Sequence, residues 1–271
     1  MSHFDSDYYQ LFRPDYPVKL FVGFKRELIA QGFKEPFEIA DIGCGTGLSL
    51  AAMLKTSLRV HAFAVDPDAR MIEKAKEDPR LAEVVFSIGE GARSGLGEHS
   101  VDAILVGSAF HWMNSQETAQ EFARILRPNG ILWIFETQFP KSLELAELNE
   151  WIRRQFNLFW KAPGQVPRGN FQEVTKVFRN GSGWKHSRTW REPMTLALDA
   201  SALQGLLLSQ SRVLHYESLL NAQDRDAFRV ELLRKLRTWM GDTLHVFDFS
   251  LMAAVFFKTR QDPDCALPFA K

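Results

Sequence analysis

Apolar runs alternate with segments of helical period between residues 37 and 136. The strand-like runs are FEIADI, RVHAFAVD, VVFSI, VDAILV and ILWIFE, and the helical segments between them are LSLAAMLK, ARMIEKAK and ETAQEFARIL. Because the strands are largely continuous apolar runs, both faces of the sheet are expected to be covered. The alternation therefore predicts parallel strands joined by crossover helices, which is the doubly wound α/β fold.

The pattern changes after residue 140. An aromatic-rich helical stretch, LAELNEWIRRQFNLFW, precedes a loop with several prolines and glycines, and together they predict a helical insertion over residues 141–183. A strand is expected at residues 184–197, followed by helices near 199–209 and 223–239. A final apolar strand is expected in FDFSLMAAVFFKT. We interpret the insertion as a lid.

Three glycines, Gly43, Gly45 and Gly47, stand at the predicted turn between the first strand and its helix. Glycine permits positive φ and lets a ligand approach the backbone, and the helix N-terminus offers free N–H groups. A tight turn without a ligand is the alternative interpretation of these glycines taken alone.

Asp66 ends the next predicted strand, roughly 20 residues beyond the glycines, where an acidic side chain can accept hydrogen bonds from ribose hydroxyls. Alternatively, Asp66 caps the following helix, with Pro67 at its first position. The spacing G-x-G-x-G differs from the G-x-G-x-x-G of dinucleotide sites, which disfavours a nicotinamide oxidoreductase. The expected ligand is a nucleoside without a pyrophosphate.

Five motifs occur in order over residues 36–137: IADIGCGTG, AVDPDARMIEKAK, GEGARSGL, SVDAILVGSAFHWMN and RILRPNGIL. Together they resemble the motifs of class I S-adenosylmethionine-dependent methyltransferases. The resemblance is closest to the small-molecule branch with a type 11 methyltransferase domain, which includes trans-aconitate methyltransferase-like proteins that also begin with a segment like YYQLFRPDYP. It implies a Rossmann-like sheet with an antiparallel final strand, and S-adenosylmethionine as cofactor.

The resemblance also implies a set of cofactor-binding residues. Asp41 and Gly43 would line the methionine part, and Asp66 would bind the ribose. Arg13 would pair with the cofactor carboxylate, although a plain surface arginine is the alternative. The full set is Arg13, Asp41, Gly43, Gly45, Asp66, Pro67, Met71, Glu90, Gly91, Ser108 and Ala109. Within it, Glu90 stands where relatives often have an aspartate, which alters the motif on the adenine side.

The chain is expected to consist of five segments. These are an N-terminal segment that covers the cofactor, the S-adenosylmethionine-binding core, the helical lid insertion, the C-terminal part of the core, and a tail. Their bounds are 1–35, 36–140, 141–183, 184–260 and 261–271.

His111 follows the strand VDAILV and is the candidate catalytic residue, as a general base or a substrate ligand. The alternative is a histidine packed beside Trp112. Aromatic side chains could form the wall of the substrate pocket and favour the positive charge of the sulfonium. Those expected there are Tyr8, Tyr9, Phe110 and Trp112. Plain core aromatics would give the same sequence pattern.

Residues 151–191 contain nine basic residues and one acid, Glu173, although the whole chain has a formal net charge of zero. This excess suggests an anionic substrate held by arginines such as Arg153 and Arg168. Two alternatives are a solvated basic face and a nucleic-acid surface in which aromatic residues stack on bases. The aromatic candidates are Trp160, Phe171, Trp184 and Trp190.

The two cysteines, Cys44 and Cys265, lack the partners that a disulfide framework or a metal site requires, so no metal is expected. The sequence contains neither a recognisable signal peptide nor an apolar run long enough for a membrane span, so a cytoplasmic protein is expected. The predicted activity is methylation of a small, acidic molecule by direct in-line transfer. The alternatives are a catalytically silent cofactor-binding regulator or scaffold and an RNA methyltransferase, and nucleic acid is the less favoured partner.

Overall fold

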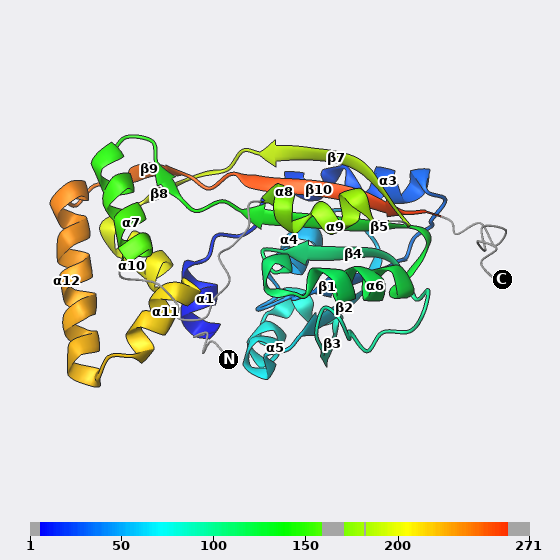
Figure 1. Cartoon of the computed structure of the whole chain (residues 1–271), viewed down its shortest axis with the longest axis horizontal. Coiled ribbons are helices and arrows are strands. Elements are labelled where there is room, and N and C mark those ends of the chain that lie inside the picture. The colour runs from blue at the N-terminus through cyan, green and yellow to red at the C-terminus, as the bar shows by residue number, and fades with distance from the viewer. Residues whose placement is uncertain (1–5, 159–170, 182, 260–271) are drawn as a thin grey trace, which may run out of the picture. The chain divides into compact units, whose positions relative to one another are not determined.

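The computed structural model describes residues 6–158, 171–181 and 183–259, and the chain forms two compact units (Figure 1). Unit 1 comprises residues 1–15, 137–167 and 192–251, and unit 2 comprises residues 16–136, 168–191 and 252–271. Each unit is therefore assembled from three separate stretches of sequence. These boundaries cut across the predicted segments, because the 141–183 insertion contributes to both units.

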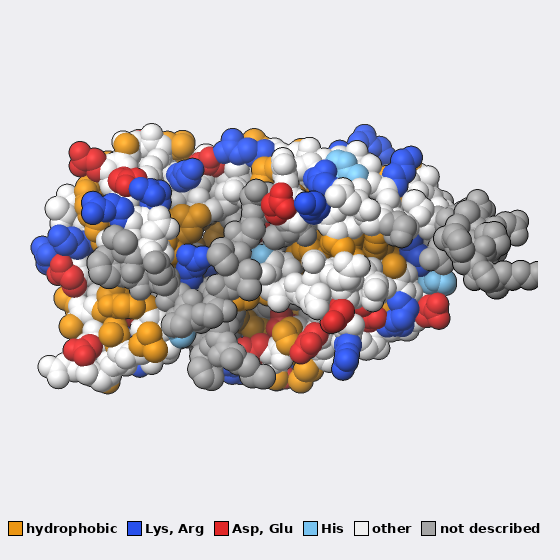
Figure 2. Space-filling model, in the orientation of Figure 1, with side chains coloured by type: hydrophobic (Ala, Val, Ile, Leu, Met, Phe, Trp, Pro, Cys, Tyr) orange, Lys and Arg blue, Asp and Glu red, His pale blue; other side chains and the backbone are white. Residues whose placement is uncertain are grey.

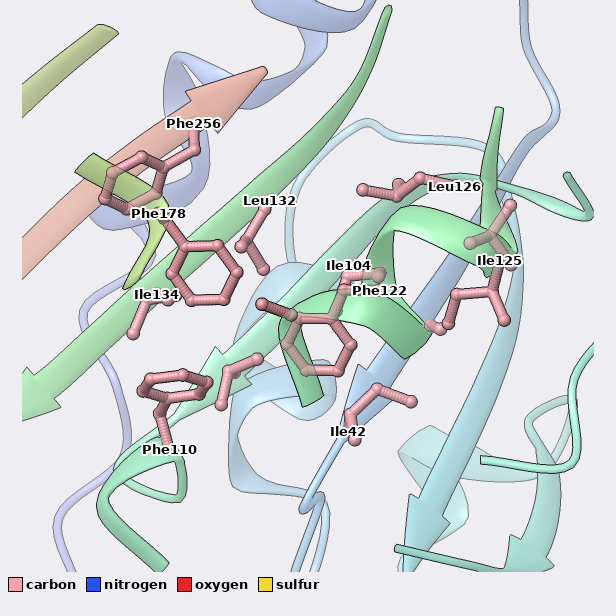
Figure 3. Packing of buried hydrophobic residues seen from close by; sticks show 14 of the residues in the cluster. Ile42, Ile104, Phe110, Phe122, Ile125, Leu126, Leu132, Ile134, Phe178 and Phe256 are labelled. Carbon is pink, nitrogen blue, oxygen red and sulfur yellow. The ribbon is translucent and has the colours of Figure 1, made fainter. Parts of the chain in front are cut away.

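The larger sheet has seven strands, and its order confirms the predicted doubly wound α/β fold. In spatial order the strands are β3 (Val85–Ile88), β2 (Val60–Asp66), β1 (Phe37–Ile42), β4 (Val101–Gly107), β5 (Leu126–Thr137), β10 (Leu251–Lys258) and β7 (Trp184–Glu192). Strand β1 pairs in parallel with β2 and β4, β2 with β3, and β4 with β5. The last strand, β10, runs opposite to β5 (Figure 3), so the predicted antiparallel final strand is confirmed.

Both faces of this sheet are covered, as strand β5 illustrates. Its side chains alternate between the two faces of the sheet. Trp133 packs edge-on against Phe24 of α3 (Phe24–Ala30), with ring centroids 4.8 Å apart. The next residue, Ile134, belongs to the core cluster on the other face, with Phe122 of α6 (Ser115–Ile125). This two-sided burial explains the continuous apolar runs of the parallel strands.

The crossover helices begin and end close to their predicted bounds. The remaining helices of unit 2 are α2 (Lys19–Val22), α4 (Leu48–Met53), α5 (Ala69–Lys76), α8 (Phe171–Val174) and α9 (Lys176–Asn180), with short 3-10 turns η1 (Pro79–Leu81) and η2 (Phe110–Trp112). Helix α5 coincides with the predicted segment ARMIEKAK.

The insertion supplies helices to both units. Helix α7 (Ala146–Leu158) belongs to unit 1, whereas α8 and α9 belong to unit 2. Phe178 of α9 is fully buried and contacts the rings of Phe110, Phe122 and Phe256 (Figure 3). This second half of the insertion is thus part of the core of unit 2.

Unit 1 combines helices with a three-stranded antiparallel sheet of order β6-β9-β8. Its other elements are α1 (Ser6–Phe12), β6 (Lys141–Ser142), β8 (Thr195–Leu198), α10 (Ala200–Leu208), α11 (Ser211–Ser218), α12 (Ala222–Met240) and β9 (His245–Asp248). Helices α10 and α12 match the two predicted helices, whereas α1 and α11 are not among the predicted elements. Within the ranges that the structure describes, no helix has the length and apolar content needed to cross a bilayer.

Candidate active site

The glycine turn lies at the carboxyl ends of β1 and β4, where the strand order of the sheet reverses. Ligands of open α/β sheets bind at this switch point. Gly43 and Gly45 have φ of +75° and +56°, which residues with a Cβ rarely adopt. A Cβ on Gly43 would lie 2.6 Å from Cβ of Ala109, whereas one on Gly45 would have no atom within 4 Å. Packing therefore leaves no room for a side chain at Gly43, whereas the space next to Gly45 is open.

Asp66 connects β2 to this turn. Its carboxylate accepts hydrogen bonds from the backbone N–H of Gly45 (2.8 Å) and of Asp68 (2.9 Å). The cap of α5 is Asp68, whose side chain accepts from Arg70 N, so the alternative role of Asp66 as the helix cap is wrong. Pro67 precedes that cap and is not the first helical residue, because α5 begins at Ala69. Asp66 thus fixes the open glycine from a buried position.

Asp41 is the most deeply buried acid of the site. Burial raises the pKa of its carboxyl to about 7, against the opposing effect of a hydrogen bond from Ser49, and the charge of Asp66 raises it further. The second carboxylate oxygen, Oδ1, has no hydrogen-bond partner among the described residues. The hydroxyl of Thr46, in the same turn, is likewise buried without a partner there. Such unsatisfied buried atoms fit a site that receives a polar ligand.

The loop after β3 brings Glu90 and Gly91 next to the same region. Glu90 and Arg93 exchange backbone hydrogen bonds in a tight turn, and Gly89 N donates to Asp66 O (3.2 Å). The Glu90 side chain is exposed, while Gly91 is buried. A Cβ on Gly91 would lie 2.6 Å from Sδ of Met113, whose Cε would also lie 3.1 Å from a Cβ on Gly43. Met113, which sequence reasoning missed, therefore packs against both glycine positions.

The remaining predicted cofactor residues have distinct surroundings. Met71 is buried in α5, and Pro67 is exposed. The Cys44 side chain is buried, and burial raises the pKa of its thiol well above the ordinary value. Arg13 belongs to unit 1, where it lies 4.9 Å from the ring of Tyr9 and donates to the carbonyl of Ser209 (3.4 Å).

Ser108 and Tyr16 form a polar pair at the end of β4. The Tyr16 hydroxyl donates to Oγ of Ser108 at 3.0 Å, and Ser108 N donates to Phe135 O at 2.8 Å. Ser108 has a φ of +52°, a conformation that is uncommon without glycine and clusters at functional sites. Tyr16 was not predicted as a site residue, although it lies within the quoted N-terminal motif.

His111 pairs with a glutamate that sequence reasoning missed. Its Nδ1 lies 3.3 Å from Oε1 of Glu136, and the two side chains are only 3% and 14% exposed. Its ring also lies 5.2 Å from that of Trp112. Glu136 follows Phe135 in β5, which is in register with Gly107 of β4, so the two strand ends bring the pair together. The feature of the sequence that could have identified Glu136 is its position at the end of the predicted strand ILWIFE, which pairs with β4.

The predicted aromatic pocket residues belong to different units and differ in burial. Phe110 is buried in the core of unit 2 against Phe122 and Phe178 (Figure 3), whereas Trp112 is 47% exposed. Tyr8 and Tyr9 lie on α1 in unit 1.

The basic segment is distributed over both units and is partly neutralised by acids from outside it. Arg153 is 63% exposed. Its Nη2 and Nε donate to the two carboxylate oxygens of Glu150, at 2.6 and 2.8 Å. Arg188 pairs with Glu27 at 2.5 Å. On the face drawn in Figure 2, basic side chains are scattered and often adjacent to acidic ones. Arg168 lies outside the described residues.

The aromatic residues of this segment pack into the protein. Trp184 lies edge-on to Phe178 at 5.0 Å, and Trp190 lies edge-on to Trp133 at 5.5 Å. Phe171 is buried in the core cluster. Trp160 lies outside the described residues. The described aromatics are therefore explained by core packing without a stacked base.

Comparison with known proteins identifies the region that holds the site. Residues 40–134 match the family model described as a methyltransferase domain. An uncharacterised methyltransferase of Schizosaccharomyces pombe is 29% identical over 171 residues, which is 61% of this chain and 66% of the relative. A malonyl-[acyl-carrier protein] O-methyltransferase of Halalkalibacterium halodurans is 32% identical over 113 residues, 40% of this chain and 41% of the relative. The chain thus spans less than two thirds of the length of these relatives.

Solved structures share the fold. A proposed type II methyltransferase from Anaeromyxobacter dehalogenans matches with a TM-score of 0.63 and 19% identity, over 90% of this chain and 97% of that one. The matched family region runs from β1 into β5 and includes the glycine turn, Asp66 and His111. Residues 40–134 are therefore identified as a methyltransferase domain.

Proposed function

We propose that the protein transfers a methyl group from S-adenosylmethionine to a small molecule that carries a carboxylate. The observation that carries the cofactor part is the open glycine turn, in which Asp66 fixes Gly45 and Oδ1 of Asp41 lacks a partner among the described residues. A buried acceptor beside an open backbone turn suits the donor groups of an amino acid nucleoside.

The residues proposed to hold the cofactor belong to the turn and to the loops beside it. Asp41 and the glycine turn would hold its amino acid part, Asp66 its ribose hydroxyls, and the Gly91 loop with Met113 its base. When bound, S-adenosylmethionine supplies a methyl group that its sulfonium already activates. The protein then has to orient the acceptor, exclude water and accept any proton that is released.

The acidic acceptor rests on two kinds of support. The relative from Halalkalibacterium halodurans is named for O-methylation of a malonyl group, which contains a carboxylate. The excess of basic residues over residues 151–191 agrees with an anionic partner. An RNA substrate has weaker support, because the described aromatic side chains of that segment pack into the protein. Membership of the trans-aconitate methyltransferase-like branch stays a prediction.

Cofactor binding tests the first part of the proposal. S-Adenosylmethionine and S-adenosylhomocysteine are expected to raise the melting temperature, and NAD is not, because a ligand stabilises only the protein that binds it. Asp66→Ala should weaken binding by about 1–3 kcal/mol in calorimetry. Asp68→Ala, which removes the cap of α5 in the same turn, is the control and should bind normally. A larger thermal shift with NAD would contradict the proposal.

Turnover tests the second part. Protein mixed with methyl-labelled S-adenosylmethionine and a panel of small mono-, di- and tricarboxylic acids should transfer label to at least one acid. Binding of the cofactor without transfer to this panel, to other metabolites or to RNA would instead favour the catalytically silent regulator.

A further inference from the structure

Four polar side chains gather at the carboxyl ends of β4 and β5. Tyr16 and Ser108 are hydrogen-bonded at 3.0 Å, and His111 and Glu136 are paired at 3.3 Å. The backbone connects the two pairs, because Ser108 N donates to the carbonyl of Phe135, the residue before Glu136. Parallel α/β sheets place their reacting groups at this edge.

The pairing determines which nitrogen of His111 carries a proton. A carboxylate beside Nδ1 favours the neutral tautomer with the proton on Nδ1, which leaves the lone pair on Nε2. The same carboxylate stabilises the imidazolium that forms when Nε2 takes up a proton. A histidine oriented in this way by a partly buried acid is suited to general base catalysis.

A general base discriminates between acceptor groups. A carboxyl group has an ordinary pKa near 4, so at neutral pH it is already ionised and has no proton to lose. A hydroxyl has an ordinary pKa of about 10 or higher and becomes a strong nucleophile only as its proton leaves. A carboxylate acceptor therefore does not need the base that His111 and Glu136 would provide, whereas a hydroxyl acceptor does.

We propose that the atom methylated is a hydroxyl oxygen, that His111 removes its proton, and that Glu136 is a positioning residue for His111. This inference rests on the proposed methyltransferase function, and it assigns the carboxylate of the substrate to binding. A bond forms between the hydroxyl oxygen and the methyl carbon, the carbon–sulfur bond of the donor breaks with its electron pair left on sulfur, and the proton moves to Nε2 of His111.

The first test needs no known substrate. Nitrogen-15 NMR of the protein with bound S-adenosylhomocysteine reports which imidazole nitrogen of His111 carries the proton, and a His111→Gln variant assigns the signals. The expected result is a neutral ring protonated on Nδ1, with Nε2 unprotonated. Glu136→Leu should shift the population toward the other tautomer. A wild-type ring protonated on Nε2 would overturn the proposal.

The second test identifies the acceptor atom. Methyl-labelled S-adenosylmethionine is supplied with acids paired with their hydroxylated counterparts, such as benzoate with 4-hydroxybenzoate and succinate with malate. Label is expected only with the hydroxylated members, as an ether that resists mild alkali. A methyl ester that mild alkali cleaves, formed equally well by His111→Gln, would overturn the proposal.

The variants separate a catalytic role from a structural one. His111→Gln should lower the transfer rate by about 100-fold or more. Glu136→Gln should lower it by about 10-fold, and Glu136→Asp should restore part of the rate. Affinity for S-adenosylhomocysteine should stay at the wild-type level in all three variants. A wild-type rate in Glu136→Gln would reject the positioning role of Glu136, whereas failure of the wild-type protein to bind the cofactor would reject the proposed function itself.

Discussion

Asp41 is a fully buried acid whose ionisation depends on the fold. Its carboxyl has an ordinary pKa of 3.8 in the unfolded chain, and burial raises that pKa to about 7 in the folded protein. Between these values the folded protein holds a proton that the unfolded chain has released. Stability from this group is therefore present at low pH and is lost as the pH rises through about 7.

Asp41→Asn should remove this dependence. Without bound cofactor, the wild-type free energy of unfolding should fall between pH 4 and 7 by up to about 1.4 kcal/mol per pH unit because of Asp41. Asparagine can still accept the hydrogen bond from Ser49 and has no charge to bury. Urea unfolding at several pH values measures the difference, and parallel curves for the two proteins would contradict it.

At the level of single residues, the sequence predicted the site residues that have a typical spacing along the chain. It did not predict those that are recognised only by their contacts in the folded protein. Gly45 and Asp66 were expected as ligand-facing residues, and the structure joins them by a hydrogen bond. Glu136 lies outside the quoted motifs, and Met113 lies within one without a role assigned to it, since only the folded strand ends show what these two residues touch. The alternative role for Asp66 failed because Asp68, two residues later, provides the same capping chemistry.

Helix α9 shows how an element of the insertion is anchored. Its Phe178 ring stacks in parallel on Phe122 of α6, with centroids 6.3 Å apart, and lies 5.4 Å from Phe256 of β10. Such tertiary contacts are needed to fix so short a helix, because five residues form too few internal hydrogen bonds to be stable alone.

Phe178→Ala should therefore destabilise the protein by about 3–5 kcal/mol, the usual cost of removing a buried phenylalanine. Lys176→Ala, an exposed change on the same helix, is the control and should cost less than about 0.5 kcal/mol. Chemical denaturation of the three proteins measures both effects. Equal stability of the two variants would show that α9 is not held by its aromatic contacts.

The elements of the cofactor-binding core were predicted closely, whereas two later strands were predicted as single and are divided. The expected strand at 184–197 is β7 and β8, separated around Pro193, and the final apolar run is β9 and β10, separated at Phe249 and Ser250. In both cases the two halves belong to different sheets. Apolar periodicity continues through such a division, because each half still buries a face, so the pattern does not reveal the change of sheet.

For the whole molecule, the order of strands matters more than their number. Strand β10 lies between β5 and β7, so β7 reaches the rest of the sheet only through β10. A chain that ends at Ser250 should therefore lose both strands from the sheet and expose the apolar edge of β5. We expect such a chain to be unfolded by circular dichroism and to aggregate. Wild-type affinity for S-adenosylhomocysteine in the shortened chain would contradict this expectation.

The same strand order affects how the large sheet forms while the chain is being synthesised on the ribosome. Strand β7 emerges from the ribosome before the strand that will separate it from β5, and residue 258 must be synthesised before the sheet can close. Until then the nascent chain has two unfilled strand edges, one on β5 and one on β7, which offer matching hydrogen-bonding groups to each other and to neighbouring chains. Pairing β5 directly with β7 would trap the chain in a sheet with no place for β10. Delaying that pairing by chaperone binding, or shortening the interval by rapid translation of the residues between β7 and β10, would favour the native sheet.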